Sequence, residues 1–264
     1  MAEGANPAAI IEFRHVTCDL SAGHRVLSGL DLQVQRGETL ILLGRSGSGK
    51  TTTLKLINGL LSATQGEVRV EGSNVAAADL IALRRKIGYV IQEGGLFPHF
   101  TVERNIGLVP KIEGWAPQRI SARVQELMGL TGLDPQLGSR YPHQLSGGQR
   151  QRVGVARALA ADPQILLMDE PFGALDPLTR DELQRAFLEL QQRLRKTVVF
   201  VTHDLNEALR LGTRIALMES GKLVTISTSQ EFIHSPDPLA MKYVAAFQTG
   251  VLAAQSAQQN RVER

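Results

Sequence analysis

The stretch TLILLGRSGSGKT, residues 39–51, decides the fold of this chain. Residues 39–43 form a short apolar run typical of a buried strand, and residues 50–60 continue with a helical pattern. Between them, residues 44–51 match G-x-x-x-x-G-K-[ST], a glycine-rich loop whose backbone N–H groups and following helix N-terminus bind phosphate. The stretch therefore predicts an α/β fold built around a phosphate-binding loop.

The candidate phosphate site consists of this loop and the first turn of the helix. Lys50 would place a cation on the β- and γ-phosphates, and Thr51 would offer its hydroxyl to Mg²⁺. The alternative, a glycine-rich structural turn, is disfavoured by the strand before the loop and the helix after it. The candidate nucleotide-binding residues are Gly44, Arg45, Ser46, Gly47, Ser48, Gly49, Lys50, Thr51 and Thr52.

Further apolar runs alternate with helical patterns, which indicates an α/β fold with a mostly parallel sheet. Most of these strands are apolar throughout, as expected of strands that are covered on both faces. Other runs predict an antiparallel β portion. The expected parallel strands lie at 39–44, 87–91, 164–169 and 197–202, the helices at 50–60, 177–195 and 204–211, and the antiparallel runs at 10–17, 30–34 and 66–70.

Helix-start signals support the later helices. Pro177 stands at a first helical position, and Asp204 with Glu207 has the spacing of a capping box. From about residue 94 to 160 the strand signal vanishes, and helical patterns at 117–129 and 147–161 take its place. We expect one P-loop NTPase domain over residues 1–264, with a core at about 8–93 and 161–248, an inserted helical subdomain at about 94–160 and a flexible tail at 249–264.

Composition excludes several classes of protein. Of the 264 residues, 43% are hydrophobic, which suffices for a packed interior, and the net charge of +3 comes from basic residues scattered among acidic ones, which argues against nucleic-acid binding. No run approaches the roughly 18 to 20 apolar residues of a membrane span, and the N-terminus lacks a signal-peptide pattern, so we expect a cytoplasmic protein. Cys18 is the only cysteine, which excludes an intrachain disulfide.

A second motif, ILLMDE at residues 165–170, ends an apolar strand with two carboxylates. Ligands bind at the C-terminal ends of strands in open α/β sheets, so this strand would bring Asp169 and Glu170 to the phosphate loop. Asp169 would help to hold Mg²⁺, and Glu170 would polarise an attacking water. The alternative is a pair of solvated acids, which fits less well beside a phosphate loop.

A third motif, LSGGQR at residues 145–150, begins a predicted helix with adjacent glycines. Ser146 and Gln149 have the spacing of a capping box, in which each side chain satisfies a backbone donor of the first turn. A cap does not require Gly147 and Gly148, and each costs roughly 1 kcal/mol in a helix interior, though less near its start. Their bare backbone needs another explanation.

Together, GRSGSGKT, LSGGQ and LLMDEP in this order resemble the ATP-binding subunits of ABC transporters, over about residues 10–247. The resemblance implies that residues 44–51 are the Walker A loop, residues 165–169 the Walker B strand and Glu170 the catalytic glutamate. It also implies ATP and Mg²⁺ as cofactors, with Thr51, Gln92 and Asp169 at the metal.

Single residues match further loops of the family. Gln92 in YVIQEGG matches the glutamine that senses Mg²⁺ and water, Asp176 in GALD the loop that communicates across the dimer, and His203 in VFVTHD the histidine that contacts the γ-phosphate. Each has a simpler alternative: a polar residue after a strand, a helix N-cap and a histidine satisfied by neighbouring backbone. The resemblance adds Gln92 and His203 to Glu170 as expected catalytic residues.

The resemblance also implies partners. Like subunits, in the simplest case a homodimer, would close head to tail so that each ATP lies between one Walker A loop and the other subunit's signature motif. The glycines would let that helix N-terminus approach the γ-phosphate, with a hydrogen bond from Ser146. An integral membrane permease and, indirectly, an extracytoplasmic solute-binding protein would place the chain at the cytoplasmic face of the inner membrane. The signature residues are Leu145, Ser146, Gly147, Gly148 and Gln149.

The stretch YVIQEGGLFPHFTVERNIGLVPKIEGW, residues 89–115, is similar to ATPases of osmoprotectant importers, which take up glycine betaine, choline and related quaternary amines. An importer of another small solute, such as amino acids or sulfonates, is the alternative. Leu96 and Phe97 are candidate apolar contacts for the permease, or else members of the subdomain core. Some of these ATPases carry a C-terminal pair of regulatory domains, which we expect this chain to lack.

Other functional classes fit less well. A soluble ABC ATPase acting on DNA would carry long coiled-coil heptads where this chain has only about 95 residues between Walker A loop and signature, and ribosome-acting relatives usually carry two cassettes. A non-hydrolysing regulator conflicts with the presence of both Glu170 and His203.

One position departs from the family, which usually stacks an aromatic ring on adenine where this chain has Leu20. Base stacking is worth roughly 1 to 3 kcal/mol, so we expect a weaker affinity for ATP than in an aromatic-bearing relative unless Phe13 or His24 takes this place.

Overall fold

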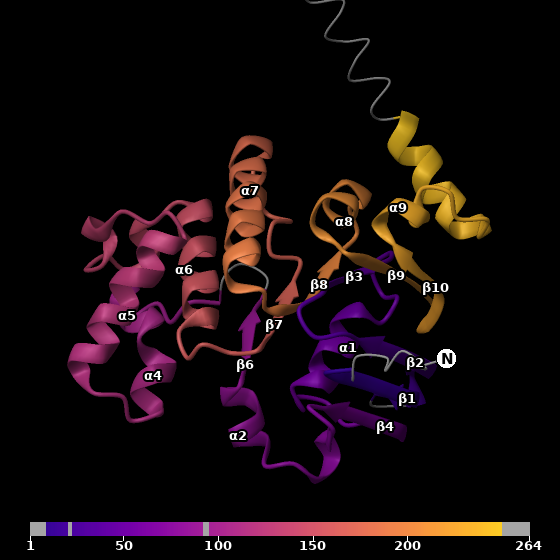
Figure 1. Ribbon diagram of the computed structural model, residues 1–264, viewed down its shortest axis with the longest axis horizontal. Helices are drawn as coiled ribbons and strands as arrows, with labels where there is room; N and C mark the ends of the chain where they lie inside the picture. The colour runs from indigo at the N-terminus through magenta and orange to yellow at the C-terminus, as the bar shows by residue number, and fades with distance from the viewer. Residues whose placement is uncertain (1–8, 21–22, 92–94, 250–264) are drawn as a thin grey trace, which may run out of the picture.

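The structure is a computed structural model that describes residues 9–20, 23–91 and 95–249. The expected metal residue Gln92 and the expected tail after residue 249 lie outside the described residues. A larger and a smaller sheet stand side by side, with helices packed on them (Figure 1). In the part of the chain that the structure describes, no helix has both the length and the apolar character needed to cross a bilayer.

The larger sheet is mostly parallel, as the sequence predicts. Its strand order is β10-β9-β3-β8-β7-β6, in which β10 pairs antiparallel with β9 and every other pairing is parallel. The phosphate loop follows β3, in the middle of this sheet. The strands are β3 (Thr39–Leu43), β6 (Ile87–Val90), β7 (Ile165–Asp169), β8 (Thr197–Thr202), β9 (Arg214–Glu219) and β10 (Lys222–Thr228).

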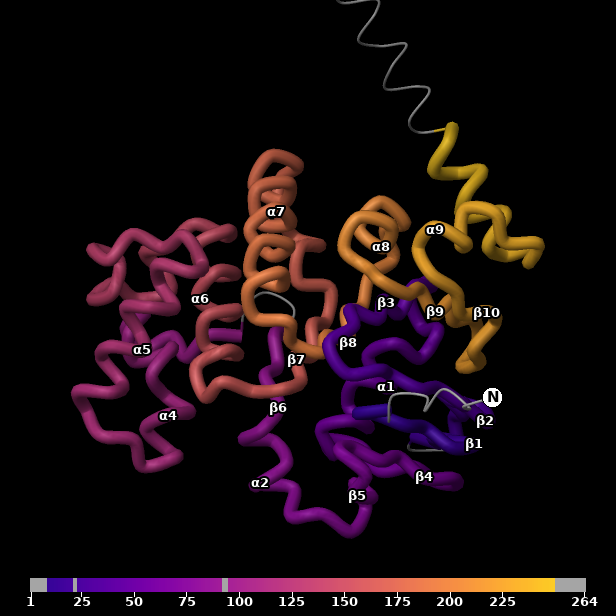
Figure 2. Tube along the Cα trace, viewed as in Figure 1, coloured from indigo at the N-terminus to yellow at the C-terminus, as the bar shows by residue number. Residues whose placement is uncertain are grey.

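The smaller sheet is the predicted antiparallel portion. Its order is β2-β1-β4-β5, and it lies next to β10 of the larger sheet, where the N–H of Ser28 donates to the carbonyl of Gly221 at 3.0 Å. Figure 2 shows it at the lower right, in indigo and violet. Its strands are β1 (Ile11–Asp19), β2 (Arg25–Val34), β4 (Gln65–Val70) and β5 (Ser73–Asn74).

The helices follow the predicted distribution. Between residues 95 and 160 the chain forms helices and turns and no strand, and this helical region adjoins the β6 edge of the larger sheet (Figure 2). A last helix covers residues 238–249. The others are α1 (Lys50–Ile57), α2 (Leu80–Arg85), α3 (Val102–Ile106), α4 (Leu108–Ile112), α5 (Pro117–Leu130), α6 (Gly147–Leu159), α7 (Pro177–Leu194), α8 (Leu205–Leu211) and α9 (Ser229–Phe232).

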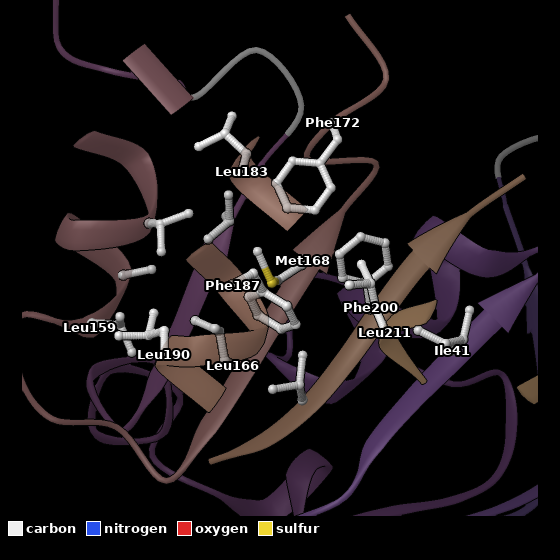
Figure 3. Close-up of a cluster of buried hydrophobic side chains, with 14 of the residues drawn as sticks. Ile41, Leu159, Leu166, Met168, Phe172, Leu183, Phe187, Leu190, Phe200 and Leu211 are labelled. Atoms are coloured by element: carbon white, nitrogen blue, oxygen red, sulfur yellow. The ribbon is translucent and has the colours of Figure 1, made fainter. Parts of the chain in front are cut away.

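The larger sheet separates distinct hydrophobic clusters because successive side chains of a strand point to opposite faces. Met168 and Phe200 belong to the cluster that contains α7, α8 and the helical region, and Figure 3 shows them beside Phe187 of α7. Their strand neighbours Leu167 and Val201 belong to the cluster formed with α1 and the smaller sheet. Both faces are covered, which explains why these strands are apolar throughout.

Helix starts agree with the sequence at two sites and differ at a third. Pro177 is the first residue of α7, and the capping box of α6 is present. At α8, Asp204 is the N-cap, with its carboxylate accepting from the N–H of Asn206 at 2.7 Å, but Glu207 does not complete the predicted box. The prediction was wrong there because the Glu207 carboxylate turns into the protein and accepts from the Thr202 hydroxyl.

Candidate functional site

The loop between β3 and α1 has the geometry of an anion site. Gly49, the residue before α1, has φ 99°, a conformation that glycine adopts without a steric penalty. No side chain caps this helix, so the backbone donors of its first turn and the positive end of its dipole are left for a ligand. This geometry fits a phosphate group.

Lys50 is buried inside the loop. Its ammonium group donates to the carbonyls of Gly44 and Arg45, each at 2.8 Å. Burial lowers the pKa of Lys50, and the nearby Glu170 and Asp169 carboxylates partly offset this effect. The lysine thus holds a positive charge at the centre of the loop, in the position that the motif predicts for a phosphate contact.

The hydroxyl of Thr51 and the carboxylate of Asp169 meet at the end of β7. Thr51 Oγ1 donates to Asp169 Oδ1 at 2.9 Å. Burial raises the pKa of Asp169, the Thr51 hydrogen bond lowers it in part, and the Glu170 carboxylate raises it further. Burial, and the Asp169 carboxylate nearby, raise the pKa of Tyr89 on β6.

This pair of oxygens fits a magnesium site. Mg²⁺ is bound in nucleotide sites by one or two carboxylates together with substrate phosphates and water, and a hydroxyl beside one carboxylate supplies hard oxygen ligands of this kind. A cluster of three or more His, Cys, Asp or Glu side chains suited to a metal is absent from the described residues. The site therefore suits a metal that arrives with phosphate.

Glu170 and His203 approach each other from neighbouring strands. Glu170 follows β7 and His203 follows β8, and His203 Nδ1 lies 3.3 Å from Glu170 Oε2. Glu170 has φ 43°, an uncommon conformation for a residue with a side chain, and its N–H donates to the carbonyl of Val201 at 3.1 Å. Backbone strain of this kind gathers at functional sites.

The signature residues 145–149 are not brought to the phosphate loop of their own chain. They lie at the start of α6, which packs beside β6 at the edge of the sheet, whereas the loop follows β3 in the middle (Figure 1). Leu145 is buried, and the exposed Ser146 accepts from the N–H of Gln149 at 3.2 Å while its own N–H donates to the Gln149 side chain at 2.9 Å.

The two signature glycines differ in their surroundings. A Cβ atom on Gly148 would lie 2.5 Å from Thr179 Cγ2 of α7, so a side chain here would force α6 or the Thr179 side chain to shift. A Cβ on Gly147 would lie 3.5 Å from Leu175 Cδ2, which is an ordinary contact. The bare backbone of Gly147 therefore has no cause among its described neighbours.

Asp176 is the N-cap of α7. Its carboxylate accepts from the N–H of Thr179 at 3.1 Å, and this hydrogen bond lowers the pKa of Asp176. The simpler interpretation as a helix cap is therefore confirmed, and a role between subunits stays a prediction.

Side-chain exposure distinguishes the residues that could stack on adenine and the residues that could contact a permease. Phe13 is 2% exposed in the core and is not available for stacking, whereas Leu20 is 39% exposed and His24 is exposed. Leu96 packs against the hydrophobic core, and Phe97 is 42% exposed. Of the two candidate permease contacts, Phe97 has the accessible side chain.

Sequence reasoning missed Glu207 and Tyr89. The capping-box spacing seemed to account for Glu207, although its position between Leu205 and Ala208 on the buried side of α8 is a signal against a surface role. Tyr89 is the one polar side chain in the strand IGYV, and its position three residues before Gln92 gave no sign that the Asp169 carboxylate influences its pKa.

Comparison with known proteins agrees with this site. The family model for the ABC transporter matches residues 27–173. The chain is 52% identical over 215 residues to the glycine betaine uptake system ATP-binding protein YehX of Escherichia coli (strain K12), which covers 81% of this chain and 70% of that protein. It is 47% identical over 227 residues to the glycine betaine/carnitine/choline transport ATP-binding protein OpuCA of Bacillus subtilis (strain 168), which covers 86% of this chain and 60% of that one.

The chain thus spans about 60% of the length of relatives such as OpuCA. Among solved structures, the ATP-binding cassette MJ0796, a dimer in a post-hydrolysis state bound to ADP and Pi, matches with a TM-score of 0.76 and 34% identity, over 83% of this chain and 98% of that one. The two chains therefore share the same overall fold over this matched part. Since the family model covers more than half of its 264 residues, this chain belongs to the ABC transporter family.

Proposed function

We propose that this chain is the ATP-hydrolysing subunit of an importer for quaternary-amine osmoprotectants such as glycine betaine and choline. The observation that carries the ATPase part is the meeting of Thr51, Asp169, Glu170 and His203 at the strand ends beside the uncapped N-terminus of α1. The solute class is supported by the names of the relatives, which mention glycine betaine, carnitine and choline.

Each residue has a task in hydrolysis. The phosphates of ATP lie in the loop of residues 44–52, where Lys50 neutralises charge on the β- and γ-groups. Magnesium held by Thr51 and Asp169, and by Gln92 as the resemblance implies, would neutralise more of the phosphate charge. Glu170 accepts a proton from the attacking water, and His203, 3.3 Å from that carboxylate, contacts the γ-phosphate.

The same proposal includes partners. A second like subunit supplies its residues 145–149 to complete the ATP site, and Asp176 lies at the contact between subunits. The post-hydrolysis cassette dimer supports this arrangement. A permease docks near Phe97 and receives solute from an extracytoplasmic binding protein, so the chain is peripheral at the cytoplasmic face of the inner membrane. Residues 8–93 and 161–248 form the ATPase core, and residues 94–160 form the helical subdomain.

Solute uptake tests this function. In cells that encode the chain, Glu170→Gln should reduce uptake of radiolabelled glycine betaine and choline at raised osmolarity to background, because the proton acceptor is lost while the shape is kept. Amino-acid and sulfonate uptake should not change. The control is Glu182→Gln on α7, whose side chain is exposed and lies 3.9 Å from Arg152.

Each failure has a distinct meaning. Loss of amino-acid or sulfonate uptake in place of glycine betaine uptake would contradict the solute class. Unchanged uptake of every solute would contradict the transport role and favour a soluble ATPase, such as one acting on ribosomes or DNA.

A further inference from the structure

Glu207 is a buried carboxylate that the proposed chemistry does not use. It lies in the first turn of α8, directly after the turn that carries His203, and is 4% exposed. Burial raises its pKa, and the hydrogen bonds it accepts from Thr202 and Gln184 lower it in part. A buried carboxylate is unfavourable unless it is hydrogen-bonded, and apolar residues of similar volume often give equal stability. Its presence here calls for a functional reason.

The contacts of Glu207 lead to the His203 turn. Thr202 Oγ1 donates to Glu207 Oε2 at 2.6 Å, and the same hydroxyl accepts from the N–H of Asp204 at 3.0 Å. His203 stands between these two residues. The carboxylate therefore fixes the hydroxyl that closes the turn around His203.

Helix α7 supports this arrangement from the other side. Gln184 Nε2 donates to Glu207 Oε1 at 3.1 Å. The amide has a defined orientation because Gln184 Oε1 accepts from Arg210 at 3.0 Å, which leaves its nitrogen to face the carboxylate. Arg180, one turn earlier on α7, lies 3.9 Å from the Asp204 carboxylate and donates to the carbonyl of Leu175 at 3.1 Å.

His203 itself has little packing to hold it. Its side chain is 61% exposed, and its Nδ1 lies 3.3 Å from the Glu170 carboxylate. An exposed ring keeps its place through the backbone that carries it, and a displacement of about 1 Å in a catalytic group is enough to reduce turnover about a hundredfold.

We propose that Glu207 is a positioning residue for ATP hydrolysis: by fixing the Thr202 hydroxyl it holds the turn at residues 202–204, and so keeps the His203 imidazole at Glu170. The inference rests on the roles proposed above for Glu170 and His203. It adds a buried group that touches neither the nucleotide nor the metal.

The test removes the hydroxyl of Thr202 and keeps the shape of the side chain. In the full chain with Mg-ATP, Thr202→Val should lower kcat about tenfold to a hundredfold and leave KM within about twofold, because the nucleotide-binding loop is unchanged. Thr202→Ser keeps the hydroxyl and should restore kcat. The matched control is Thr131→Val, which removes a buried hydroxyl that donates to the carbonyl of Leu127 at 2.8 Å in the helical region and should leave kcat unchanged.

The outcomes separate this inference from its premise. An equal fall of kcat in Thr202→Val and Thr131→Val, or a failure of Thr202→Ser to restore it, would overturn the positioning role. The turnover of His203→Ala is measured alongside. If His203→Ala loses turnover while Thr202→Val keeps it, the inference about Glu207 fails and the role proposed for His203 stands. If His203→Ala keeps the parental kcat, the role assigned to His203 fails and this inference fails with it.

Discussion

Among single residues, Asp169 has a buried carboxyl group whose charged form is poorly solvated. Burial raises the pKa of its carboxyl, and Glu170 raises it further. A group whose pKa is raised by folding contributes most to stability below its ordinary pKa, and that contribution is lost as the pH rises through the raised value. Asp169→Asn removes this loss, so the nucleotide-free variant should be more stable than the parent above the raised pKa and equal to it in acid. Urea unfolding across a pH series measures the difference.

Asp181 supplies a control of opposite sign. Arg210 lowers the pKa of its carboxyl through a hydrogen bond of 2.6 Å, so its contribution to stability is present above the ordinary pKa and is lost as the pH falls through the lowered value. Asp181→Asn should therefore gain no stability at neutral pH. If Asp169→Asn also gained no stability at neutral pH, the charge of Asp169 would not be destabilising the parent protein.

At the scale of elements, the contact between α6 and α7 makes substitution of the two signature glycines differ in its effect on stability. Gly147→Ala should leave the free energy of unfolding unchanged or raise it by up to about 1 kcal/mol, because alanine favours helices and the added methyl finds an ordinary contact. Gly148→Ala should lower it by about 1 to 3 kcal/mol, since the methyl would press on Thr179. Urea unfolding measures both.

The functional comparison uses the same pair of variants. Gly147→Ala should fail to associate when Mg-ATP is added, because its methyl group would occupy the surface offered to the partner's nucleotide. Sedimentation velocity with and without Mg-ATP reports the association. A Gly147→Ala chain that associates like the parent would contradict the proposal that this helix start meets a second subunit.

The sequence predicts elements well where burial dictates their composition. β3, β7 and β8 are covered on both faces and therefore read as continuous apolar runs. The hairpin of β9 and β10 was not predicted, although Ser220 and Gly221 separate two suitable runs. The sheet order was beyond reach, because β3 pairs with β8 and β9, which are distant along the chain.

In the candidate site, too, some residues could be predicted from the sequence and others depend on packing that the sequence does not reveal. Loop and strand-end motifs have fixed spacing, so Lys50, Thr51 and Asp169 could be selected from the sequence and lie together. Glu207 could not, because its spacing from Asp204 suits a cap equally well and packing alone turns its carboxylate inward. The surroundings of Gly148 depend on α7, which the sequence does not place beside α6.

For the whole molecule, the proposed assembly has a direct physical test. Glu170→Gln keeps the volume and hydrogen-bonding shape of the side chain but removes the proton acceptor, so ATP should stay bound and the closed dimer should accumulate. Sedimentation velocity should show a monomer without nucleotide and a dimer with Mg-ATP. Adding Lys50→Ala to this variant should keep it monomeric. A Glu170→Gln chain that remains monomeric at saturating Mg-ATP would contradict assembly around the nucleotide.

The separate clusters on the two faces of the larger sheet have a mechanical consequence. Helix α1 with the phosphate loop belongs to one face, while α7, α8 and the helical region belong to the other. Because the strands lie between these two layers, a movement of the helical region relative to α1 would also displace the strands. Glu170 and His203 follow the ends of β7 and β8, so a movement of these strands would change the 3.3 Å distance between their side chains.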